Sequence, residues 1–235
     1  MARAPVPVSK ETMLIGVHQI SLAGVRDIAP EALGEDGHVK VMPAGFYAVT
    51  SLNERAVFAV RNGLYCLPTT ELVDWLRDVI SGQSAIEIGA GNGVIAAALG
   101  IPATDSWMQE HPAIAAYYRV HAQPTVRYGA HVEKLAAYEA VRKYRPDVVI
   151  ASWVTRKYDE REHAAGGNAL GVDELDVLKH CKRYVLIGNT QVHAKSALWQ
   201  RKPMLHENPR WLYSRAVNGS PDFVAIWEGG AAQHH

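Results

Sequence analysis

The sequence predicts an α/β fold, a mostly parallel β-sheet with helices on both faces. Segments whose apolar residues recur at helical spacing alternate with short apolar runs of strand length, at residues 85–88, 101–104, 148–150 and 184–187. Strands that alternate with helices are joined by crossovers, and crossovers make neighbouring strands parallel. The length of 235 residues allows one such domain with an extension.

The first 62 residues come before this alternation, and we expect residues 1–62 to form an N-terminal helical extension. Residues 1–10 predict a loose arm. Apolar side chains recur at helical intervals through residues 10–32, which predicts a helix. Asn53 is a suitable N-cap for a further helix that ends at Gly63.

Residues 63–235 form the predicted main domain. Pro68, next to two threonines, indicates the start of a helix that runs to Gly82, just before the first strand. A short helix at residues 94–99 follows that strand, and Gly100 caps it.

The later segments continue the alternation of strand and helix. Residues 125–128 predict a third strand, residues 132–144 an amphipathic helix, and residues 172–181 a further helix. Two last strands, at residues 211–217 and 223–227, are separated by the turn signal Asn-Gly-Ser-Pro. We expect these two strands to form a closing antiparallel pair.

Three glycines at alternate positions, Gly89, Gly91 and Gly93, follow the first strand, and the acidic Glu87 stands near its end. Glycine lets the backbone turn sharply and lets a ligand approach main-chain N–H groups. The helix that follows directs its positive end at the turn, which favours an anionic group there. The nicotinamide-dinucleotide fingerprint needs its third glycine one position later, where this chain has Val94, so a dehydrogenase is disfavoured.

The resulting pattern, E-x-G-x-G-x-G between a strand and a helix, resembles the first motif of class I S-adenosylmethionine-dependent methyltransferases. The resemblance extends over about residues 63–228 and implies a Rossmann-like, seven-stranded sheet. In that family the acidic residue and the glycine turn hold the methionine end of the cofactor. The resemblance therefore assigns S-adenosylmethionine binding to Glu87, Gly89, Ala90, Gly91, Asn92 and Gly93.

Further cofactor contacts are implied at the ends of the next strands. Family members place an acidic side chain at the end of the second strand, where it accepts both ribose hydroxyls, and Asp105 stands there. Ser106 and Trp107 follow, and Trp107 either stacks on the adenine or belongs to the core. After the fourth strand the resemblance implies Ser152 and Trp153, which would face the methyl group that is transferred.

The helix before the first strand is preceded by a loop that covers the cofactor in several branches of the family. Tyr65 and Thr69 are the candidates for that cover, and Tyr65 is equally suited to the core. Many relatives carry Asp where this chain has Ala130, so the adenine pocket must differ, and His131 is the candidate substitute.

No residue stands out as catalytic. The expected reaction is an in-line displacement at the sulfonium methyl, in which positioning of the reactants supplies much of the acceleration. An oxygen nucleophile would need a general base, and Tyr65, His131 and His193 are the candidates. The charged, glycine-containing residues 156–168 predict either a lid over the site or an ordinary exposed loop.

Composition restricts the acceptor and the cellular environment. Lys+Arg and Asp+Glu are 24 each, so no basic surplus favours nucleic acid, and we expect a small-molecule substrate. The 11 histidines and 2 cysteines show no metal-ligand spacing, so no metal is expected. No apolar run is long enough to span a bilayer and residues 1–8 lack a signal pattern, which predicts a cytoplasmic protein without membrane contact. The sequence gives no indication of an oligomeric state.

Two other functions remain open from the sequence. The chain could be an S-adenosylmethionine-binding regulatory or degenerate module, which the missing acid at Ala130 favours. It could also be another transferase or a lyase that uses the same cofactor. Aminopropyl transfer to a polyamine would need paired acids near the fourth strand, where the chain has Ser152 and Trp153.

Overall fold

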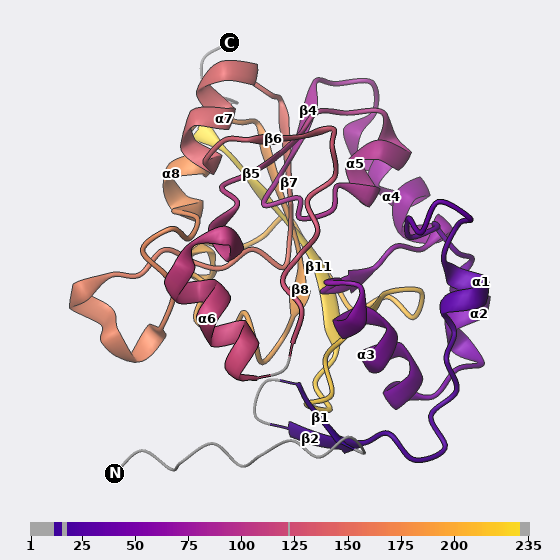
Figure 1. Ribbon diagram of the computed structural model, residues 1–235. Helices are drawn as coiled ribbons and strands as arrows, with labels where there is room; N and C mark the ends of the chain where they lie inside the picture. Colours follow the sequence, from indigo (N-terminus) through magenta and orange to yellow (C-terminus); the bar gives the residue numbers. More distant parts are fainter. Residues whose placement is uncertain (1–11, 16–17, 122, 231–235) are drawn as a thin grey trace.

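A seven-stranded sheet forms the centre of the protein in the computed structural model, which describes residues 12–15, 18–121 and 123–230 (Figure 1). The strands lie in the order β6, β5, β4, β7, β8, β11, β9 across the sheet. Their bounds are β4 (Ala85–Ile88), β5 (Ala103–Asp105), β6 (Val132–Lys134), β7 (Val148–Ser152), β8 (Arg183–Asn189), β9 (Leu205–Glu207) and β11 (Asp222–Glu228).

The strands from β6 to β8 are parallel, and β11 runs antiparallel to both of its neighbours. The chain first passes from β4 outward to β5 and β6 and then returns to β7 on the other side of β4. The strand order therefore reverses between β4 and β7, which is where open α/β sheets bind ligands at the carboxyl ends of their strands. This arrangement confirms the expected α/β class with a Rossmann-like, mostly parallel sheet.

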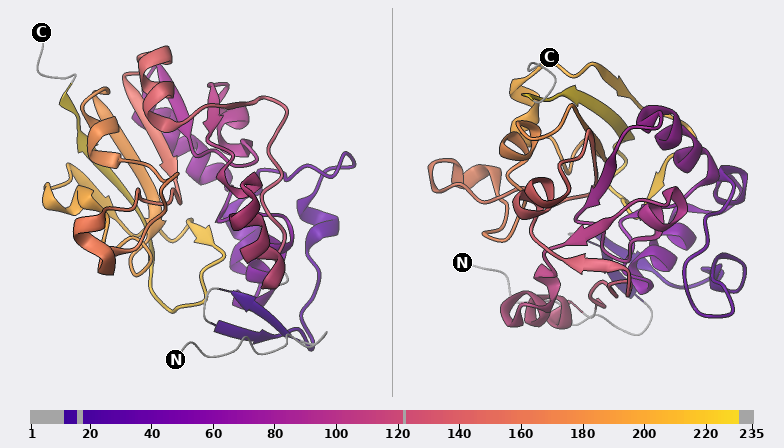
Figure 2. Two further views of the ribbon diagram at one scale, coloured as in Figure 1. Left: turned by 60° about the vertical axis from the view of Figure 1, so that its left-hand side comes forward. Right: turned by 90° about the horizontal axis from the view of Figure 1, so that it is seen from above.

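Helices cover both faces of the sheet (Figure 2). On one face, α7 (Ala137–Tyr144) and α8 (Glu174–Leu178) pack against side chains such as Ile86 and Val149. On the other face, α4 (Thr70–Ile80) and α5 (Val94–Leu99) pack against the alternate positions, such as Ala85, Val148 and Ile150. Because successive strand side chains point to opposite faces, strands covered on both sides are apolar throughout, as the sequence shows for β7.

The elements that flank the glycine motif follow the sequence closely. The helix α4 begins after Thr69, whose side-chain oxygen accepts a hydrogen bond from the Leu72 N–H at 3.1 Å. The helix α5 spans the predicted residues and is bounded by Gly93 and Gly100, with φ of 74° and 69°. Left-handed backbone at both ends explains why the sequence has glycine there.

The predicted helix over residues 10–32 is wrong for most of its described part. The strands β1 (Thr12–Ile15) and β2 (His18–Ser21) form an antiparallel hairpin, and only α1 (Ala29–Ala32) is helical. Short apolar runs are compatible with both the 3.6-residue repeat of a helix and the 2-residue repeat of a strand. Here the buried residues Ile15 and Ile20 belong to strands that pack on α3. The predicted arm at residues 1–10 lies outside the described residues.

Two further N-terminal helices, α2 (Ala44–Ala48) and α3 (Leu52–Arg61), complete this part of the chain. The N-cap of α3 is Ser51 rather than the predicted Asn53. The Ser51 hydroxyl accepts from the Glu54 N–H at 3.2 Å, and the Glu54 carboxylate accepts from the Ser51 N–H at 2.6 Å. This reciprocal capping box is more favourable than a single capping oxygen.

The third strand is also misplaced by the sequence prediction. No strand forms at residues 125–128; instead β6 is the third strand, and α7 begins only at Ala137. The loop at Val126 is held by a hydrogen bond from its N–H to Gln109 Oε1 at 2.8 Å. A three-residue strand is too short to show alternation, and for that reason its residues were absorbed into the predicted helix over 132–144.

The predicted antiparallel pairing of the two last strands is wrong. β10 (Tyr213–Ser214) pairs with β3 (Cys66–Leu67) in a separate small sheet, and β11 pairs with β9 instead. Among the described residues, α6 (Pro112–Val120) and the 3-10 turns η1 (Met108–Glu110), η2 (Glu160–Ala165) and η3 (Ala197–Gln200) complete the fold. The predicted helix over 172–181 is reduced to α8.

Candidate functional site

Two adjoining cavities lie at the carboxyl ends of β4, β5 and β7, next to the point where the strand order reverses. The first cavity is lined by the glycine turn after β4, by residues after β5 and by residues after β7. The structure brings together there the predicted residues Tyr65, Glu87, Gly89, Ala90, Gly91, Asn92, Asp105, Ser106, Ser152 and Trp153.

The glycine turn has a backbone that other residues rarely adopt. Gly89, Gly91 and Gly93 have φ of 58°, 57° and 74°. A Cβ at Gly89 would lie 2.7 Å from the Cγ1 of Val154, and a Cβ at Gly91 would lie 3.3 Å from the Cγ1 of Val126. Conformation and space therefore both require glycine in this turn.

Asp105 links the end of β5 to the glycine turn. Its Oδ2 accepts a hydrogen bond from the Gly91 N–H at 3.0 Å, and its Oδ1 accepts one from the Trp107 N–H at 2.7 Å. Burial raises the pKa of this carboxyl, and the two backbone N–H groups oppose that shift. The acidic side chain and the glycine turn thus border the same cavity.

Glu87 is buried beneath the turn. Its Oε2 accepts from the Ala96 N–H in the first turn of α5 at 2.9 Å, so the carboxyl satisfies one of the free donors of that helix. Burial raises the pKa of Glu87 to about 8. The group therefore holds its proton near neutral pH and can donate as well as accept a hydrogen bond.

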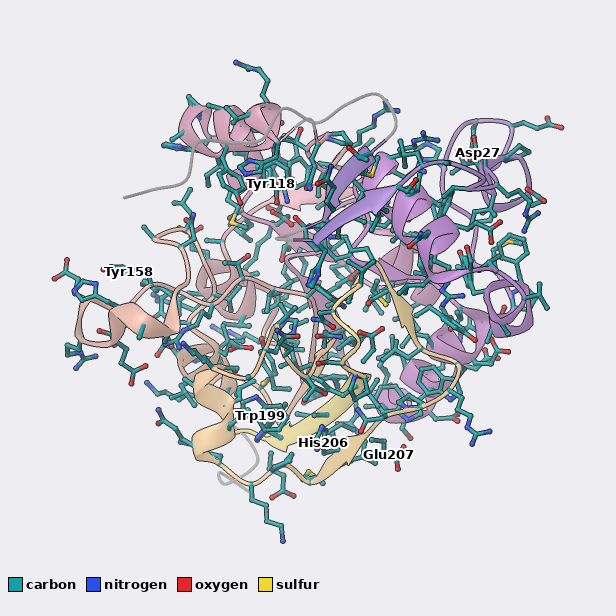
Figure 3. All side chains as sticks on the ribbon, turned by 90° about the horizontal axis from the view of Figure 1, so that it is seen from below. Asp27, Tyr118, Tyr158, Trp199, His206 and Glu207 are labelled. Carbon is teal, nitrogen blue, oxygen red and sulfur yellow. The ribbon has the colours of Figure 1, made fainter. Side chains whose placement is uncertain are left out.

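Tyr65 forms part of the wall between the cavities, because it lines both of them. Its hydroxyl bonds the hydroxyl of Tyr118 on α6 and accepts from Gln109 Nε2 at 3.1 Å. Tyr118 points from α6 toward the body of the protein (Figure 3). The guanidinium of Arg215 lies 3.6 Å from the centre of the Tyr65 ring, and the Trp153 ring centre is 6.1 Å away.

These contacts keep the first cavity small. Its volume is about 100 Å³, whereas pockets that hold drug-sized ligands typically measure about 300–1,000 Å³. Gln109 connects the covering residues, because it bonds both the Tyr65 hydroxyl and the Val126 N–H. A ligand as large as a nucleoside derivative would enter only if this cover moved.

The second cavity is larger, about 550 Å³, and shares Tyr65, Trp153, Val154 and Thr155 with the first. Glu174 lines it and is buried, with Oε2 accepting from Ser196 Oγ at 2.5 Å. Burial raises the pKa of Glu174 to about 7, although the Ser196 hydrogen bond opposes the shift. A buried carboxyl that titrates near neutral pH is suited to proton transfer.

His193 also lines the second cavity, but its environment makes it a weak base. Its Nδ1 lies 3.0 Å from the Asn189 N and 3.2 Å from the Asn189 carbonyl oxygen, so the Asn189 backbone engages this nitrogen. Burial lowers the pKa of His193 to about 4. The ring is therefore neutral at physiological pH.

Several predicted site residues do not line either cavity. Thr69 is the N-cap of α4 and also donates to the Trp211 carbonyl at 3.2 Å. His131 lies with Nε2 3.0 Å from the Gly93 carbonyl, behind the glycine turn. Trp107 stacks on Tyr128 with ring centres 5.0 Å apart. Gly93 is in the turn but is not part of the cavity lining.

Other lining residues were missed by the sequence prediction. Those in the first cavity are Gly63, Leu64, Cys66, Val94, Ile95, Gln109, Val126, Tyr128, Val154, Thr155, Leu170, Gly171 and Val172. Met108, which from the sequence either stacks on the adenine or belongs to the core, lines this cavity as well. Val154 and Thr155 directly follow the predicted residues after β7, so their position was a usable signal. Gln109 lies in η1 and Val126 in a loop, and no local pattern in the sequence indicated their place.

The segment at residues 156–168 is joined to the site at its base. The Lys157 N–H donates to the Val172 carbonyl at 2.8 Å, and the Tyr158 N–H donates to the Asn168 carbonyl at 2.9 Å. Arg156, Ala165 and Gly167 line the second cavity, whereas Tyr158 projects from the body of the protein (Figure 3). Both ends of the segment therefore border the site.

Two buried indole nitrogens are left without hydrogen-bond partners within the described residues. They are Nε1 of Trp107 and Nε1 of Trp153. Most buried polar atoms are paired, so an unpaired donor indicates a partner absent from the protein itself. Trp153 lines both cavities, which makes its position directly relevant to ligand binding.

Comparison with known proteins gives similar folds at low identity. No protein-family model and no curated protein matches the chain. A solved structure from Thermoplasma acidophilum is 13% identical, with 76% of this chain and 97% of that chain covered and a TM-score of 0.38. A putative S-adenosylmethionine-dependent methyltransferase from Streptococcus mutans is 7% identical, covering 66% of this chain and 47% of that chain, with a TM-score of 0.35. An RNA methyltransferase from Salinibacter ruber in complex with S-adenosyl-L-homocysteine is 12% identical, covering 68% and 90%, with a TM-score of 0.30.

Similarities with such low identities and TM-scores do not indicate the function of this protein. The fold and site define a Rossmann-like α/β protein with two connected ligand cavities at the carboxyl edge of its sheet. Within the described residues, no helix is long and apolar enough to cross a membrane.

Proposed function

We propose that the protein binds S-adenosylmethionine in the first cavity and acts as a class I methyltransferase. One observation carries the proposal. Asp105, at the carboxyl end of β5, is bonded to the N–H of Gly91 in the turn after β4, and both border one cavity. The pattern E-x-G-x-G-x-G and the acid of the second strand are thus neighbours in space, although 14 residues separate Gly91 and Asp105 in the sequence.

The residues of the first cavity fit the chemistry of this cofactor. Asp105 is a double acceptor suited to a pair of ribose hydroxyls, and Glu87 can donate or accept beside the glycine turn. Tyr128 and Met108 add aromatic and apolar surface suited to an adenine. The small volume implies that Gln109 and its partners move when the cofactor binds.

The second cavity is the proposed acceptor site. When bound, S-adenosylmethionine would supply an electrophilic methyl group, whose carbon a nucleophile of the acceptor would attack in line while the sulfur leaves as a neutral thioether. Tyr65 and Trp153 border both cavities, so they orient the two reactants against each other and exclude water between them. A volume of about 550 Å³ suits a small-molecule acceptor. Ile15 and His18 also line this cavity, so the N-terminal extension helps to shape it.

Glu174 is the proposed general base where the acceptor must lose a proton. It lies in the acceptor cavity, and its pKa of about 7 lets it accept a proton at neutral pH. The predicted candidates are less suited. His193 has a lowered pKa, and His131 is engaged with the Gly93 carbonyl.

A second candidate function is a cofactor-binding regulatory module without turnover. The observation that favours it is the closed first cavity, in which Asp105 and Glu87 already bond the backbone of the protein. Another transferase or a lyase with the same cofactor would share the first cavity and differ in the second. Cofactor binding with no methyl transfer to any acceptor would favour the regulatory module.

Amide hydrogen exchange with and without S-adenosylhomocysteine tests where the cofactor binds. We expect slower exchange in peptides that contain the glycine turn and in those that contain Asp105 to Gln109, because bound ligand reduces local opening. Peptides of β9 and η3 serve as internal controls, since they line neither cavity. Unchanged exchange in the glycine turn at saturating ligand would contradict the proposal. The same protection from NADH would show that the cavity does not select this cofactor.

A further inference from the structure

We propose that the second cavity recognises an anionic group of the acceptor, a carboxylate or a phosphate, through the guanidinium of Arg215. The term acceptor rests on the function proposed above. The anion site itself rests on separate observations, which are the charges of the cavity and the contacts of Arg215.

The second cavity has an excess of basic side chains. Arg156, Lys195 and Arg215 line it, and Glu174 is the one acidic residue in the lining within the described part of the chain. The Glu174 carboxyl bonds Ser196 and is about half ionised at pH 7, so three basic side chains against this one carboxyl leave an excess of positive charge. A cavity that concentrates one sign of charge attracts ligands of the opposite sign.

Two of these three basic residues are already engaged by the protein. Arg156 NH1 donates to the Lys195 carbonyl at 2.5 Å, and its NH2 lies 3.2 Å from the Glu162 carboxylate. Lys195 Nζ donates to the Ala164 carbonyl. Both side chains therefore connect the 156–168 segment to the residues after β8, and this structural role explains their presence.

Arg215 differs from the other two. Its guanidinium stacks over the Tyr65 ring, with 3.6 Å from Cζ to the ring centre. Among the residues that the structure describes, its side chain has no carboxylate within ion-pair distance and no hydrogen-bond acceptor. A stacked guanidinium keeps its N–H edge available, and that edge matches the two oxygens of a carboxylate or phosphate.

The backbone holds Arg215 against the wall between the cavities. Its N–H donates to the Tyr65 carbonyl at 3.0 Å, and the preceding strand β10 pairs with β3 directly after Tyr65. Arg215 lines the second cavity and is absent from the lining of the first. An anion on Arg215 would place the rest of the acceptor beside Tyr65 and Trp153, where methyl transfer is proposed.

Ligand-observed NMR with matched aromatic probes tests the proposal. We would titrate benzoate and phenyl phosphate, with benzamide as the neutral counterpart, into the protein saturated with S-adenosylhomocysteine. The variants are Arg215→Gln, Arg215→Lys and, as a matched control, Arg210→Gln. Arg210 is exposed and lines neither cavity, so its substitution removes the same charge at a distance. Thermal unfolding of each variant shows whether it folds.

The two anions should bind the wild-type protein and Arg210→Gln at least about tenfold more tightly than benzamide. Arg215→Gln should abolish this preference, and Arg215→Lys should retain part of it, because Lys keeps the charge but not the planar stack. Comparing the two anions identifies which group is recognised. Equal binding of benzoate and benzamide by the wild type would overturn the proposal, and so would an anion preference that persists in folded Arg215→Gln.

The same experiment separates failure of this inference from failure of the proposed function. Binding of S-adenosylhomocysteine is measured first for every variant, because Arg215 stacks on Tyr65, which lines the first cavity as well. The anion preference is then compared between variants that are each saturated with S-adenosylhomocysteine. If the protein binds the cofactor but shows no anion preference, the proposed function is retained and the anion site is rejected. For a protein that does not bind the cofactor, the probe titration is run without it. If such a protein still shows an anion preference that depends on Arg215, the anion site is retained and the methyltransferase proposal is rejected.

Discussion

Asp105 makes two hydrogen bonds that fix the first cavity at the scale of single residues. One carboxyl oxygen holds the glycine turn and the other holds the residue after Ser106. We expect Asp105→Ala to weaken binding of S-adenosylhomocysteine by about 1–3 kcal/mol, the cost of a lost charged acceptor. Isothermal titration measures the change. Asp105→Asn keeps one acceptor oxygen, so it should lose less, and unchanged affinity in folded Asp105→Ala would contradict the assignment.

The structure changes the expected effect of a substitution at Gly91. A valine at position 91 would add a side chain where a ligand is expected to approach main-chain N–H groups. The observed φ of 57° and the contact with Val126 mean that any side chain strains the turn itself. A substitution there would therefore test the fold as much as the binding, which makes Asp105 the more informative position.

His193 should stay neutral in the folded protein well below its ordinary pKa. Its Nδ1 is engaged by the Asn189 backbone, and burial lowers its pKa to about 4. We expect ¹⁵N NMR to show a neutral imidazole from pH 8 down to about 5. The unfolded chain takes up a proton near pH 6.5, so this group lowers stability as the pH falls from 6.5 toward 4. A charged imidazole at pH 6 would contradict this assignment and restore His193 as a candidate base.

At the scale of elements, the start of α4 separates a structural role from a cofactor role. Thr69 caps the helix and lies outside both cavities. We expect Thr69→Ala to lower the free energy of unfolding by about 1 kcal/mol or more, because the cap and a buried hydrogen bond are lost. Thr69→Ser should retain most of the free energy of unfolding that Thr69→Ala loses. Denaturant unfolding measures both, and a loss of cofactor affinity without a loss of stability would support the original cover assignment.

The sequence identified the elements that carry their own start and stop signals. Thr69 before α4 and Gly100 after α5 are local signals, and both helices were placed correctly. The hairpin β1–β2 and the strand β6 were missed because three or four residues are too few to distinguish a period of 2 from 3.6. The pairing of β10 with β3 depends on residues 146 positions apart in the chain, such as Tyr213 and Leu67, which no local pattern contains.

At the scale of the whole molecule, Glu174 and Glu87 should each lower stability as the pH rises from about 4.5 to 7, against the opposite contribution of His193. The raised pKa of Glu174, from 4.5 to about 7, means that the folded state holds a proton that the unfolded chain has released. The contribution is complete below pH 4.5 and is lost through pH 7, by about 3 kcal/mol. Glu87, with a pKa of about 8, also lowers the stability as the pH rises.

The variant Glu174→Gln isolates this contribution, because its side chain does not titrate. We expect it to flatten the decline of the free energy of unfolding between pH 4.5 and 7, leaving the part that Glu87 supplies. Denaturant unfolding at a series of pH values measures the slope. An equal slope in wild type and Glu174→Gln would show that Glu174 titrates normally, and its role as general base would then be withdrawn.

The site as a whole was only half predictable from the sequence. Residues at strand ends, such as Asp105 and Trp153, were found because parallel strands bring their carboxyl ends to one edge. The residues that cover the first cavity were not predicted, because the positions of Gln109 and Val126 are set by tertiary hydrogen bonds. The second cavity combines residues from the N-terminal hairpin to Asn218, and only the folded chain brings them together.

Isothermal titration of the wild-type protein with S-adenosylmethionine, S-adenosylhomocysteine and NADH tests the central claim most directly. We expect both adenosyl compounds to bind with a dissociation constant of about 1 μM, near −8 kcal/mol, and NADH to give no binding heat. Absence of binding by both adenosyl compounds to the folded protein would contradict cofactor binding. The glycine turn would then be a structural feature of the sheet.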